Sequence, residues 1–283
     1  MKFFNIDLYE YFGVKKPDGG KGTLTCYVRD NSSEINKDRR APAMLVIPGG
    51  GYGYCSPREA EPVALRYLAY GINAFVLDYS VEPVLYPFSL AEGYMAIEYL
   101  RKNALELGID GKKIAAVGFS AGGHLCGLLG SGFNSEKANA VFRGEYSHLP
   151  DAVILSYPVI TYGEKSHNGS FNNLCGDDEE LKQSLQIHKL IGKNSAPAFI
   201  WATADDGAVP VNSSLKIAAA YENAGVPFSL HIFGKGQHGL SLADETVYNT
   251  ASGAYKDATA SVRSWVNLSI EWLKEQGIAI EDN

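Results

Sequence analysis

The feature that most constrains the fold of this chain is a glycine–serine motif near its middle, which lies between two different kinds of secondary structure. Residues 113–117 form a short apolar run typical of a buried strand, and residues 124–129 are typical of the beginning of a helix. Between them the chain reads Gly118-Phe119-Ser120-Ala121-Gly122. Glycine at both ends permits a sharp strand-to-helix turn in which larger side chains would collide with the backbone. The motif therefore predicts an α/β fold with Ser120 on the crest of the turn.

An alternation of strand-like and helix-like segments extends this prediction to the rest of the chain. The apolar runs predict strands at 3–12, 23–28, 43–47, 72–77, 113–117, 152–156, 198–202 and 228–233, and helical spacing predicts further helices at 58–70, 91–107, 212–224 and 255–275. Strands that are apolar throughout and separated by helices indicate a mostly parallel sheet with helices on both faces. No repeat or linker divides the chain, so we expect a single domain over residues 1–283.

One segment, residues 160–195, interrupts the alternation. It carries glycines, asparagines and a helix-like stretch at 178–191, and it predicts no strand. Insertions that follow the carboxyl end of a strand lie over the binding edge of an open α/β sheet. We therefore expect this segment to form a small lid or a wall of a pocket. The acidic residues 177–180 are expected to begin its helix, where carboxylates interact favourably with the helix dipole.

Composition and charge exclude several classes of protein. The 283 residues carry a net charge of −7, which disfavours nucleic acid as a partner because phosphate binding needs a basic face. No apolar stretch approaches the length of a membrane-spanning helix, and the first residues become charged too early for a secretory signal. The cysteines Cys26, Cys55, Cys126 and Cys175 lack the paired spacing of disulfides or zinc sites. We expect a cytoplasmic protein with reduced thiols and without a metal or cofactor; the sequence leaves open whether it is a monomer or a homodimer.

Serine on such a turn is a candidate nucleophile if a base and an acid follow it in the chain. A serine hydroxyl needs a base to take its proton, and the base needs a third group to fix its orientation. Asp205 and Asp206 follow the predicted strand 198–202, and His238, between glycines, follows the strand 228–233. The order serine, acid, histidine is the one found in α/β hydrolases. We therefore predict Ser120 as the nucleophile and His238 as the base, with either aspartate as the acid.

A tetrahedral intermediate also needs hydrogen-bond donors for its oxyanion. The N–H of Ala121, directly after the serine, is one candidate. The turn Gly49-Gly50-Gly51 after the strand 43–47 offers others, because bare glycine backbone can approach a substrate closely. A phosphate-binding loop is the alternative interpretation of this turn, but neither GxGxxG nor GxxxxGK[ST] can be spelled from these residues.

Two further residues are candidates for contact with a substrate. Tyr52 ends the glycine turn, and His167 lies in the insertion at the rim of the expected pocket. His124, on the helix that follows Ser120, is interpreted as a packing residue that hydrogen-bonds nearby backbone. The remaining histidines are interpreted as structural or solvated: His148, His188 and His231.

From residue 43 to residue 277 the chain resembles the esterase/lipase group of the α/β hydrolases, which includes acetyl-xylan-esterase-like enzymes and relatives of hormone-sensitive lipase. The resemblance rests on residues 47–52, 77–81, 118–125, 203–210 and 231–239. The glycine turn of that group usually begins with histidine, where this chain has Pro48. The resemblance implies that the acid stands four residues before Pro210, which selects Asp206 over Asp205. It also implies that the N–H groups of Gly50 and Gly51 are the oxyanion donors of the turn.

The resemblance further implies hydrolysis of short-acyl esters, often acetates linked to sugars. We therefore predict a serine carboxylesterase whose partner is a small-molecule ester such as an acetylated sugar or xylo-oligosaccharide. Two alternatives stay open. A serine peptidase or amidase would use the same groups on the same fold. A non-catalytic binding protein on this fold typically lacks the nucleophile or the histidine, and both are present here.

Overall fold

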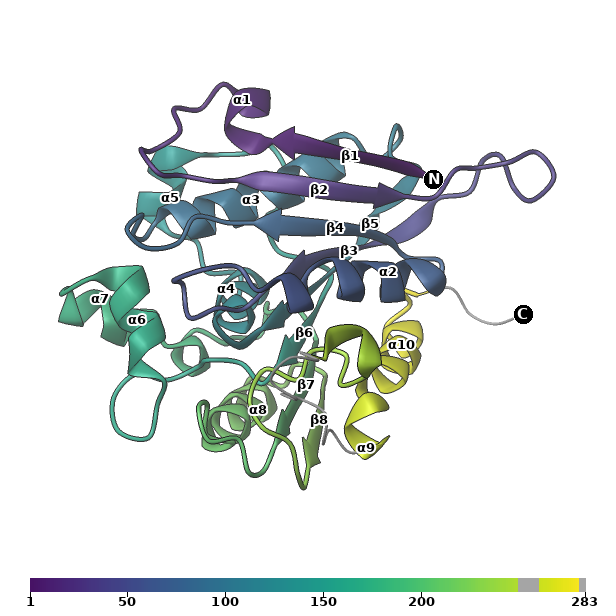
Figure 1. Ribbon diagram of the computed structural model, residues 1–283. Helices are drawn as coiled ribbons and strands as arrows, with labels where there is room; N and C mark the ends of the chain where they lie inside the picture. Colours follow the sequence, from purple (N-terminus) through teal and green to yellow (C-terminus); the bar gives the residue numbers. More distant parts are fainter. Residues whose placement is uncertain (249–259, 280–283) are drawn as a thin grey trace.

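A sheet of eight strands runs through the centre of the protein in the computed structural model, which describes residues 1–248 and 260–279 (Figure 1). The strands are β1 (Lys2–Asp7), β2 (Thr23–Val28), β3 (Ala41–Ile47), β4 (Asn73–Asp78), β5 (Ile109–Phe119), β6 (Ala152–Ser156), β7 (Ala198–Thr203) and β8 (Phe228–Phe233). Their order across the sheet is β1-β2-β4-β3-β5-β6-β7-β8. β2 is antiparallel to both of its neighbours, and every pair from β4 to β8 is parallel. This order, with an antiparallel second strand, confirms the predicted mostly parallel α/β sheet.

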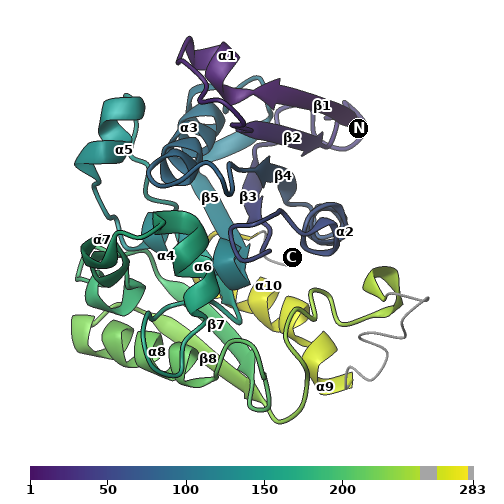
Figure 2. The ribbon, with the colours of Figure 1, turned by 60° about the vertical axis from the view of Figure 1, so that its left-hand side comes forward.

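Helices cover both faces of the sheet (Figure 2). The helices are α1 (Leu8–Phe12), α2 (Glu61–Ala69), α3 (Phe88–Lys102), α4 (Ser120–Gly130), α5 (Glu136–Val141), α6 (Asn168–Cys175), α7 (Glu179–Ser184), α8 (Asn212–Ala224), α9 (Ala260–Arg263) and α10 (Trp265–Glu275). Short 3₁₀ turns occur at η1 (Pro57–Glu59), η2 (Ile187–Lys189) and η3 (Glu245–Val247). The hydrophobic core on one face includes side chains of α3, α4 and α8, and the core on the other includes side chains of α2 and α10.

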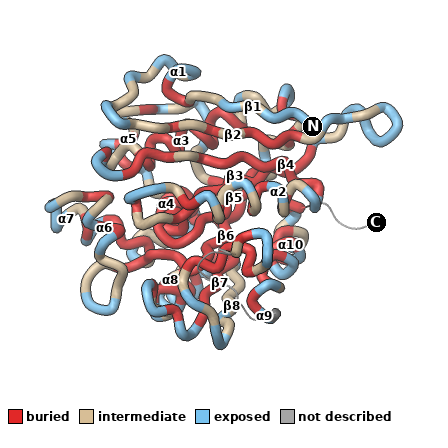
Figure 3. The backbone as a smooth tube through the Cα atoms, in the orientation of Figure 1, coloured by how far each residue is buried: buried red, intermediate tan, exposed pale blue. Residues whose placement is uncertain are grey.

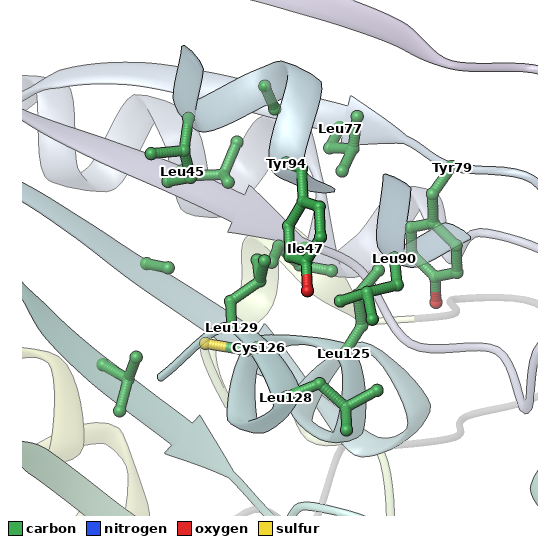
Figure 4. Close-up of a cluster of buried hydrophobic side chains, with 14 of the residues drawn as sticks. Leu45, Ile47, Leu77, Tyr79, Leu90, Tyr94, Leu125, Cys126, Leu128 and Leu129 are labelled. Carbon is green, nitrogen blue, oxygen red and sulfur yellow. The ribbon is translucent and has the colours of Figure 1, made fainter. Parts of the chain in front are cut away.

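The central strand β3 shows how one strand supplies both cores. All seven of its residues are buried (Figure 3). Leu45 and Ile47 belong to the same hydrophobic core as the leucines of α4, part of which Figure 4 shows. Met44 and Val46 point to the opposite face and pack with α2 and α10. A strand that is covered on both sides must be apolar at every position, which is why its sequence reads as a continuous apolar run.

The N-terminal segment departs from the prediction of a strand over residues 3–12. β1 ends at Asp7, and the chain turns into α1 because the Asp7 carboxylate accepts hydrogen bonds from the N–H groups of Tyr9 and Glu10. Such a cap satisfies donors that a new helix leaves unpaired, and it outweighs the alternating pattern of the sequence. The helix ends at Gly13, which has a left-handed φ of 64°.

Other boundaries shift by a few residues. The helix predicted at 91–107 is α3, and the helix predicted at 58–70 is the 3₁₀ turn η1 followed by α2. The helix predicted at 178–191 divides into α7 and η2, because Gln186 between them has an extended backbone. The Asp178 carboxylate caps α7, which confirms that the acidic residues begin a helix. Of the helix predicted at 255–275, residues 255–259 lie outside the described residues, and the rest is divided between α9 and α10.

The carboxyl ends of the parallel strands meet at one edge of the sheet, as they do in open α/β sheets generally. The glycine turn follows β3, Ser120 follows β5, and Asp206 and His238 follow β7 and β8. The predicted site residues therefore gather at this edge. Within the described ranges, no helix is both long enough and apolar enough to cross a membrane.

Candidate active site

Ser120 stands on a strained turn between β5 and α4. Its φ is +53°, a left-handed value that is unfavourable for a residue with a side chain. The turn is tight because two backbones approach closely on either side of it. A Cβ atom on Gly118 would lie 2.3 Å from the carbonyl oxygen of Gly122, and one on Gly122 would lie 2.2 Å from the carbonyl oxygens of Ile47 and Pro48. Only glycine fits at both positions, as the motif predicts.

A chain of hydrogen bonds joins Ser120, His238 and Asp206. The Ser120 hydroxyl lies 2.8 Å from Nε2 of His238, and Nδ1 of His238 lies 2.7 Å from Oδ2 of Asp206. An ionised carboxylate can only accept a hydrogen bond, so Nδ1 carries the proton and Nε2 is left to accept one from the serine. Asp206 has 1% of its side chain exposed, and the His238 side chain has 23% exposed. The His238 ring is therefore hydrogen-bonded to a buried carboxylate on one side and is partly open to solvent.

The two adjacent aspartates have different partners. The second oxygen of Asp206, Oδ1, accepts the N–H groups of Ala208 and Val209, both at 2.9 Å. These bonds fix the carboxylate on the loop after β7. Asp205 is exposed and accepts the N–H of Gly236 at 2.6 Å, which ties the aspartate loop to the histidine loop. The geometry thus favours Asp206 as the partner of His238 and gives Asp205 a structural contact.

The glycine turn after β3 is fixed at three successive peptide groups. The carbonyl of Pro48 accepts the Tyr79 hydroxyl at 2.7 Å, and the N–H in the same peptide plane, that of Gly49, donates to Glu59 at 2.8 Å. The carbonyl of Gly49 accepts the N–H of Ser56 at 2.9 Å. The carbonyl of Gly50 accepts the N–H of residues 53 and 54.

These carbonyl contacts determine where the N–H groups point. A peptide group is planar, with its C=O and the following N–H on opposite sides. Holding the carbonyls of Gly49 and Gly50 therefore aims the N–H groups of Gly50 and Gly51. In the part of the chain that is described, neither of these two N–H groups donates to a protein acceptor. The N–H of Ala121, in the first turn of α4, has no acceptor within its own helix. Three donors are thus available for an anion beside Ser120.

The chain matches the family model BD-FAE over residues 32–221. The chain belongs to this family. Its sheet order, its strand-to-helix turn at Ser120 and its similarity to solved hydrolase structures also place it within the esterase group of the α/β hydrolases.

Three relatives of this BD-FAE chain are informative. It is 39% identical over 236 residues to endo-1,4-beta-xylanase B of Butyrivibrio fibrisolvens, covering 81% of this chain and 37% of that protein. It is 29% identical over 244 residues to an acetylxylan esterase of Xylanibacter ruminicola, covering 82% of this chain and 46% of that one. The chain therefore spans less than half the length of either protein.

The third relative, which has a crystal structure, is the acetyl ester-xyloside bifunctional hydrolase from Caldicellulosiruptor lactoaceticus. It superposes on this BD-FAE chain with a TM-score of 0.77 at 36% identity, covering 91% of this chain and 89% of that one.

Tyr52 lies elsewhere than predicted. It is 1% exposed, and its hydroxyl lies 2.8 Å from Nδ1 of His124 inside the core, so its ring cannot face a substrate. Nε2 of His124 lies 2.9 Å from the carbonyl oxygen of Leu185 and must donate to it, so Nδ1 accepts from Tyr52. Burial lowers the pKa of His124 to about 4, and the ring is neutral near pH 7. His124 thus joins the glycine turn, α4 and the insertion, in agreement with its interpretation as a packing residue.

His167, in the insertion, lies next to the glycine turn. A Cβ atom on Gly51 would lie 3.8 Å from Cε1 of His167. Nδ1 of His167 is 2.8 Å from the hydroxyl of Ser170, which is buried and orients the ring. Burial lowers the pKa of His167, so the ring is neutral near pH 7. Among the described residues, Nε2 of His167 has no hydrogen-bond partner.

Two buried side chains of the site lie outside the sequence prediction. Glu59 is 2% exposed and accepts the N–H of Gly49, and Tyr157, directly after β6, packs its ring 5.0 Å from that of His238. No motif marks either residue, because each acts through contacts with segments far away in the chain. Within the described ranges, no group of three or more histidine, cysteine, aspartate or glutamate side chains is arranged to hold a metal ion.

Proposed function

We propose that this protein is a serine carboxylesterase that hydrolyses short-acyl esters. The observation that carries the proposal is the hydrogen-bonded series Ser120–His238–Asp206 beside three backbone donors, those of Gly50, Gly51 and Ala121. This arrangement supplies the nucleophile, the base, the group that orients the base, and the donors that acyl transfer requires.

The reaction proceeds in two halves. Nε2 of His238 takes the proton from the Ser120 hydroxyl as Oγ attacks the ester carbonyl carbon. The resulting oxyanion accepts hydrogen bonds from the backbone donors, and Asp206 stabilises the charged imidazole. His238 then gives the proton to the leaving alcohol oxygen, which leaves an acyl group on Ser120. Water attacks the acyl carbon, His238 takes the water proton and returns it to Oγ, and the acid is released.

The substrate class that we propose is the acetyl ester of a sugar or a xylo-oligosaccharide. One relative is named an acetylxylan esterase and another an acetyl ester-xyloside bifunctional hydrolase, and both align with most of this chain. His167 supports the same class, because a neutral ring with an unpaired Nε2 beside the oxyanion turn can hydrogen-bond a sugar hydroxyl. In this proposal residues 160–195 form a lid or pocket wall over the strand ends, fastened to α4 through His124 and Leu185.

Ser120→Ala tests the chemistry. The variant should lose more than about a thousandfold in kcat on p-nitrophenyl acetate, since the nucleophile is absent. A fluorophosphonate probe should label the wild-type protein and not the variant. Wild-type turnover in Ser120→Ala would show that the mechanism is wrong, and a wild-type protein that takes no label would indicate a non-catalytic binding protein.

A substrate panel tests the specificity. Acetylated xylo-oligosaccharides should give a higher kcat/KM than alkyl and aryl esters of two to eight carbons, with acetyl the best acyl group. An amide analogue of the same acyl group distinguishes an esterase from a peptidase or amidase. Faster cleavage of the amide than of the ester would overturn the proposed reaction, and equal rates for sugar and alkyl acetates would overturn the proposed substrate class.

We also propose that residues 1–283 work as one domain in a reducing compartment such as the cytoplasm. All four cysteines are free, and Cys26, Cys126 and Cys175 are buried. Burial raises the pKa values of these three thiols, which keeps them protonated and unreactive.

A further inference from the structure

A buried carboxylate links the oxyanion turn to the loop that carries the base. Glu59, in the 3₁₀ turn η1, is 2% exposed. Its Oε2 accepts the N–H of Gly49 at 2.8 Å, and its Oε1 accepts the hydroxyl of Tyr157 at 2.7 Å. The Tyr157 oxygen in turn accepts the N–H of Ser241 at 2.9 Å. One continuous series of hydrogen bonds therefore runs from the turn after β3, through the end of β6, to the loop after β8.

Each end of this series stands next to a group that the proposed reaction uses. Gly49 directly precedes the donor Gly50, and Ser241 lies three residues after the base His238. The Tyr157 ring also contacts the His238 ring edge-on, with ring centroids 5.0 Å apart and an interplanar angle of 72°. The same side chain thus supports the imidazole through its ring and the histidine loop through its hydroxyl.

Tyr157 and Ser241 both have a strained backbone, and the hydrogen bonds of this series can hold that backbone in place. Tyr157 has a φ of +36° and Ser241 a φ of +52°, both unfavourable for residues with side chains. Further bonds hold the same segments. The Ser241 hydroxyl donates to the carbonyl oxygen of Arg58 at 2.6 Å, and Nη1 of Arg58 donates to the carbonyl oxygen of Gly239 at 2.6 Å. Strained residues persist where the surrounding contacts over-determine them, and they are common at functional sites.

Burial of a carboxylate is costly unless its oxygens accept hydrogen bonds. Here the two carboxylate oxygens reach donors on two separate loops, a span that an apolar residue cannot bridge by hydrogen bonds. We propose that Glu59 and Tyr157 are positioning residues. Together they fix the positions of the proposed oxyanion donors and of His238 relative to each other. This inference rests on the proposed esterase function and names residues that act on its reaction through Gly49 and His238.

Glu59→Gln and Tyr157→Phe test the inference. Glutamine keeps the shape of the side chain but offers one acceptor in place of two, and phenylalanine keeps the ring but leaves the Ser241 N–H without its acceptor. Each variant should lower kcat on p-nitrophenyl acetate by about 10- to 100-fold, because small displacements of positioned groups carry costs of this size. KM should change less than about threefold, since the loss falls on the transition state and not on substrate binding.

Two further measurements separate positioning from general destabilisation. Phenylboronic acid forms a tetrahedral adduct with a serine hydroxyl, and its inhibition constant should rise in both variants in proportion to the loss of kcat/KM. The double variant Glu59→Gln/Tyr157→Phe should be about as active as the less active of the two single variants. The losses should not add, because both residues act through one series of bonds.

Glu98→Gln is the matched control. Glu98 is also a buried glutamate, at 2% exposure, and it accepts two backbone N–H groups, those of Glu145 and Tyr146 at 2.9 Å. The Glu98→Gln variant should have a melting temperature lowered about as much as that of Glu59→Gln, and its kcat should be unchanged. Equal losses of kcat in both glutamine variants, or wild-type kcat in Glu59→Gln and Tyr157→Phe, would overturn the inference. A wild-type protein that cleaves no ester and takes no fluorophosphonate would instead overturn the proposed function.

Discussion

The choice between two neighbouring carboxylates decides how the proposed base is oriented. Asp206→Asn keeps the shape of the side chain but can turn an NH₂ group toward Nδ1 of His238, which favours the tautomer with its proton on Nε2. That tautomer cannot take the Ser120 proton, so we expect kcat on p-nitrophenyl acetate to fall by about 10⁴-fold. Asp205→Asn is the matched variant: its remaining oxygen can still accept the N–H of Gly236, and kcat should stay within about threefold. The reverse ranking of the two variants would reassign the acid to Asp205.

His167 offers a test of substrate recognition at a single atom. If Nε2 binds a sugar hydroxyl, His167→Ala should raise KM for an acetylated xylo-oligosaccharide by about fivefold, since one hydrogen bond contributes about 1 kcal/mol. KM for p-nitrophenyl acetate, which has no sugar, should not change. Ser170→Ala, which removes the hydroxyl that orients the ring, should show a smaller effect in the same direction. An equal loss on both esters would place His167 outside sugar recognition.

At the scale of elements, the contact of α4 with the glycine turn is a contact between two backbones. Gly122→Ala would place a methyl group 2.2 Å from the carbonyl oxygens of Ile47 and Pro48, so the turn and the helix must move apart. We expect kcat to fall by about 100-fold, because two of the proposed oxyanion donors, Gly50 and Gly51, lie on the turn and Ser120 lies at the start of the helix.

Gly127→Ala on the same helix is the control for this prediction. There the three atoms nearest to the added methyl group all belong to the side chain of Ile187, the first at 3.0 Å, and a side chain can adjust without moving a backbone. Activity of this variant on p-nitrophenyl acetate should stay close to that of the wild type. Comparable kcat values for the two alanine variants would contradict the close-approach argument.

The elements differ in how far the sequence predicts them. The strands β3, β4, β6 and β7 are largely apolar on both faces, so the apolar runs of the sequence mark their positions. β5 is apolar only in its second half, so the sequence predicts residues 113–117 and misses its polar beginning at Ile109. The sequence does not predict α1 in this way. The helix begins because the Asp7 carboxylate caps two N–H groups, and the surrounding residues alternate as in a strand. The burial of Tyr52 is also invisible in the sequence, since its hydroxyl is paired with His124, 72 residues away.

Over the whole molecule, the sheet order brings the ends of β3, β5, β6, β7 and β8 into one site. Sequence motifs mark four of these ends and leave the fifth, at Tyr157, unmarked. Tyr157 joins Glu59 across a separation of 98 residues, and neither residue belongs to a recognisable local pattern. Contacts of this kind are set by tertiary packing, which is why the sequence predicts the groups proposed to react better than the groups that hold them in place.

Two buried titratable groups in separate parts of the core should give the protein opposing pH dependences. Burial raises the pKa of Glu92 from 4.5 to about 7, so between these pH values the folded protein binds a proton that the unfolded chain releases. Its contribution to stability is full below pH 4.5 and is lost as the pH rises toward 7. Burial lowers the pKa of His124 from 6.5 to about 4, so its contribution is full above pH 6.5 and is lost as the pH falls toward 4.

Between pH 4.5 and 6.5 each group changes the free energy of unfolding by about 1.4 kcal/mol per pH unit, and the two changes have opposite signs. They should therefore cancel in the wild-type protein, and single variants should expose them. Relative to wild type, the free energy of unfolding of Glu92→Gln should rise with pH across this window, and that of His124→Gln should fall with pH. Urea denaturation at pH 4.5, 5.5 and 6.5 measures these slopes independently of the constant cost of each substitution. Parallel pH profiles for wild type and both variants would mean that neither group changes its protonation on folding.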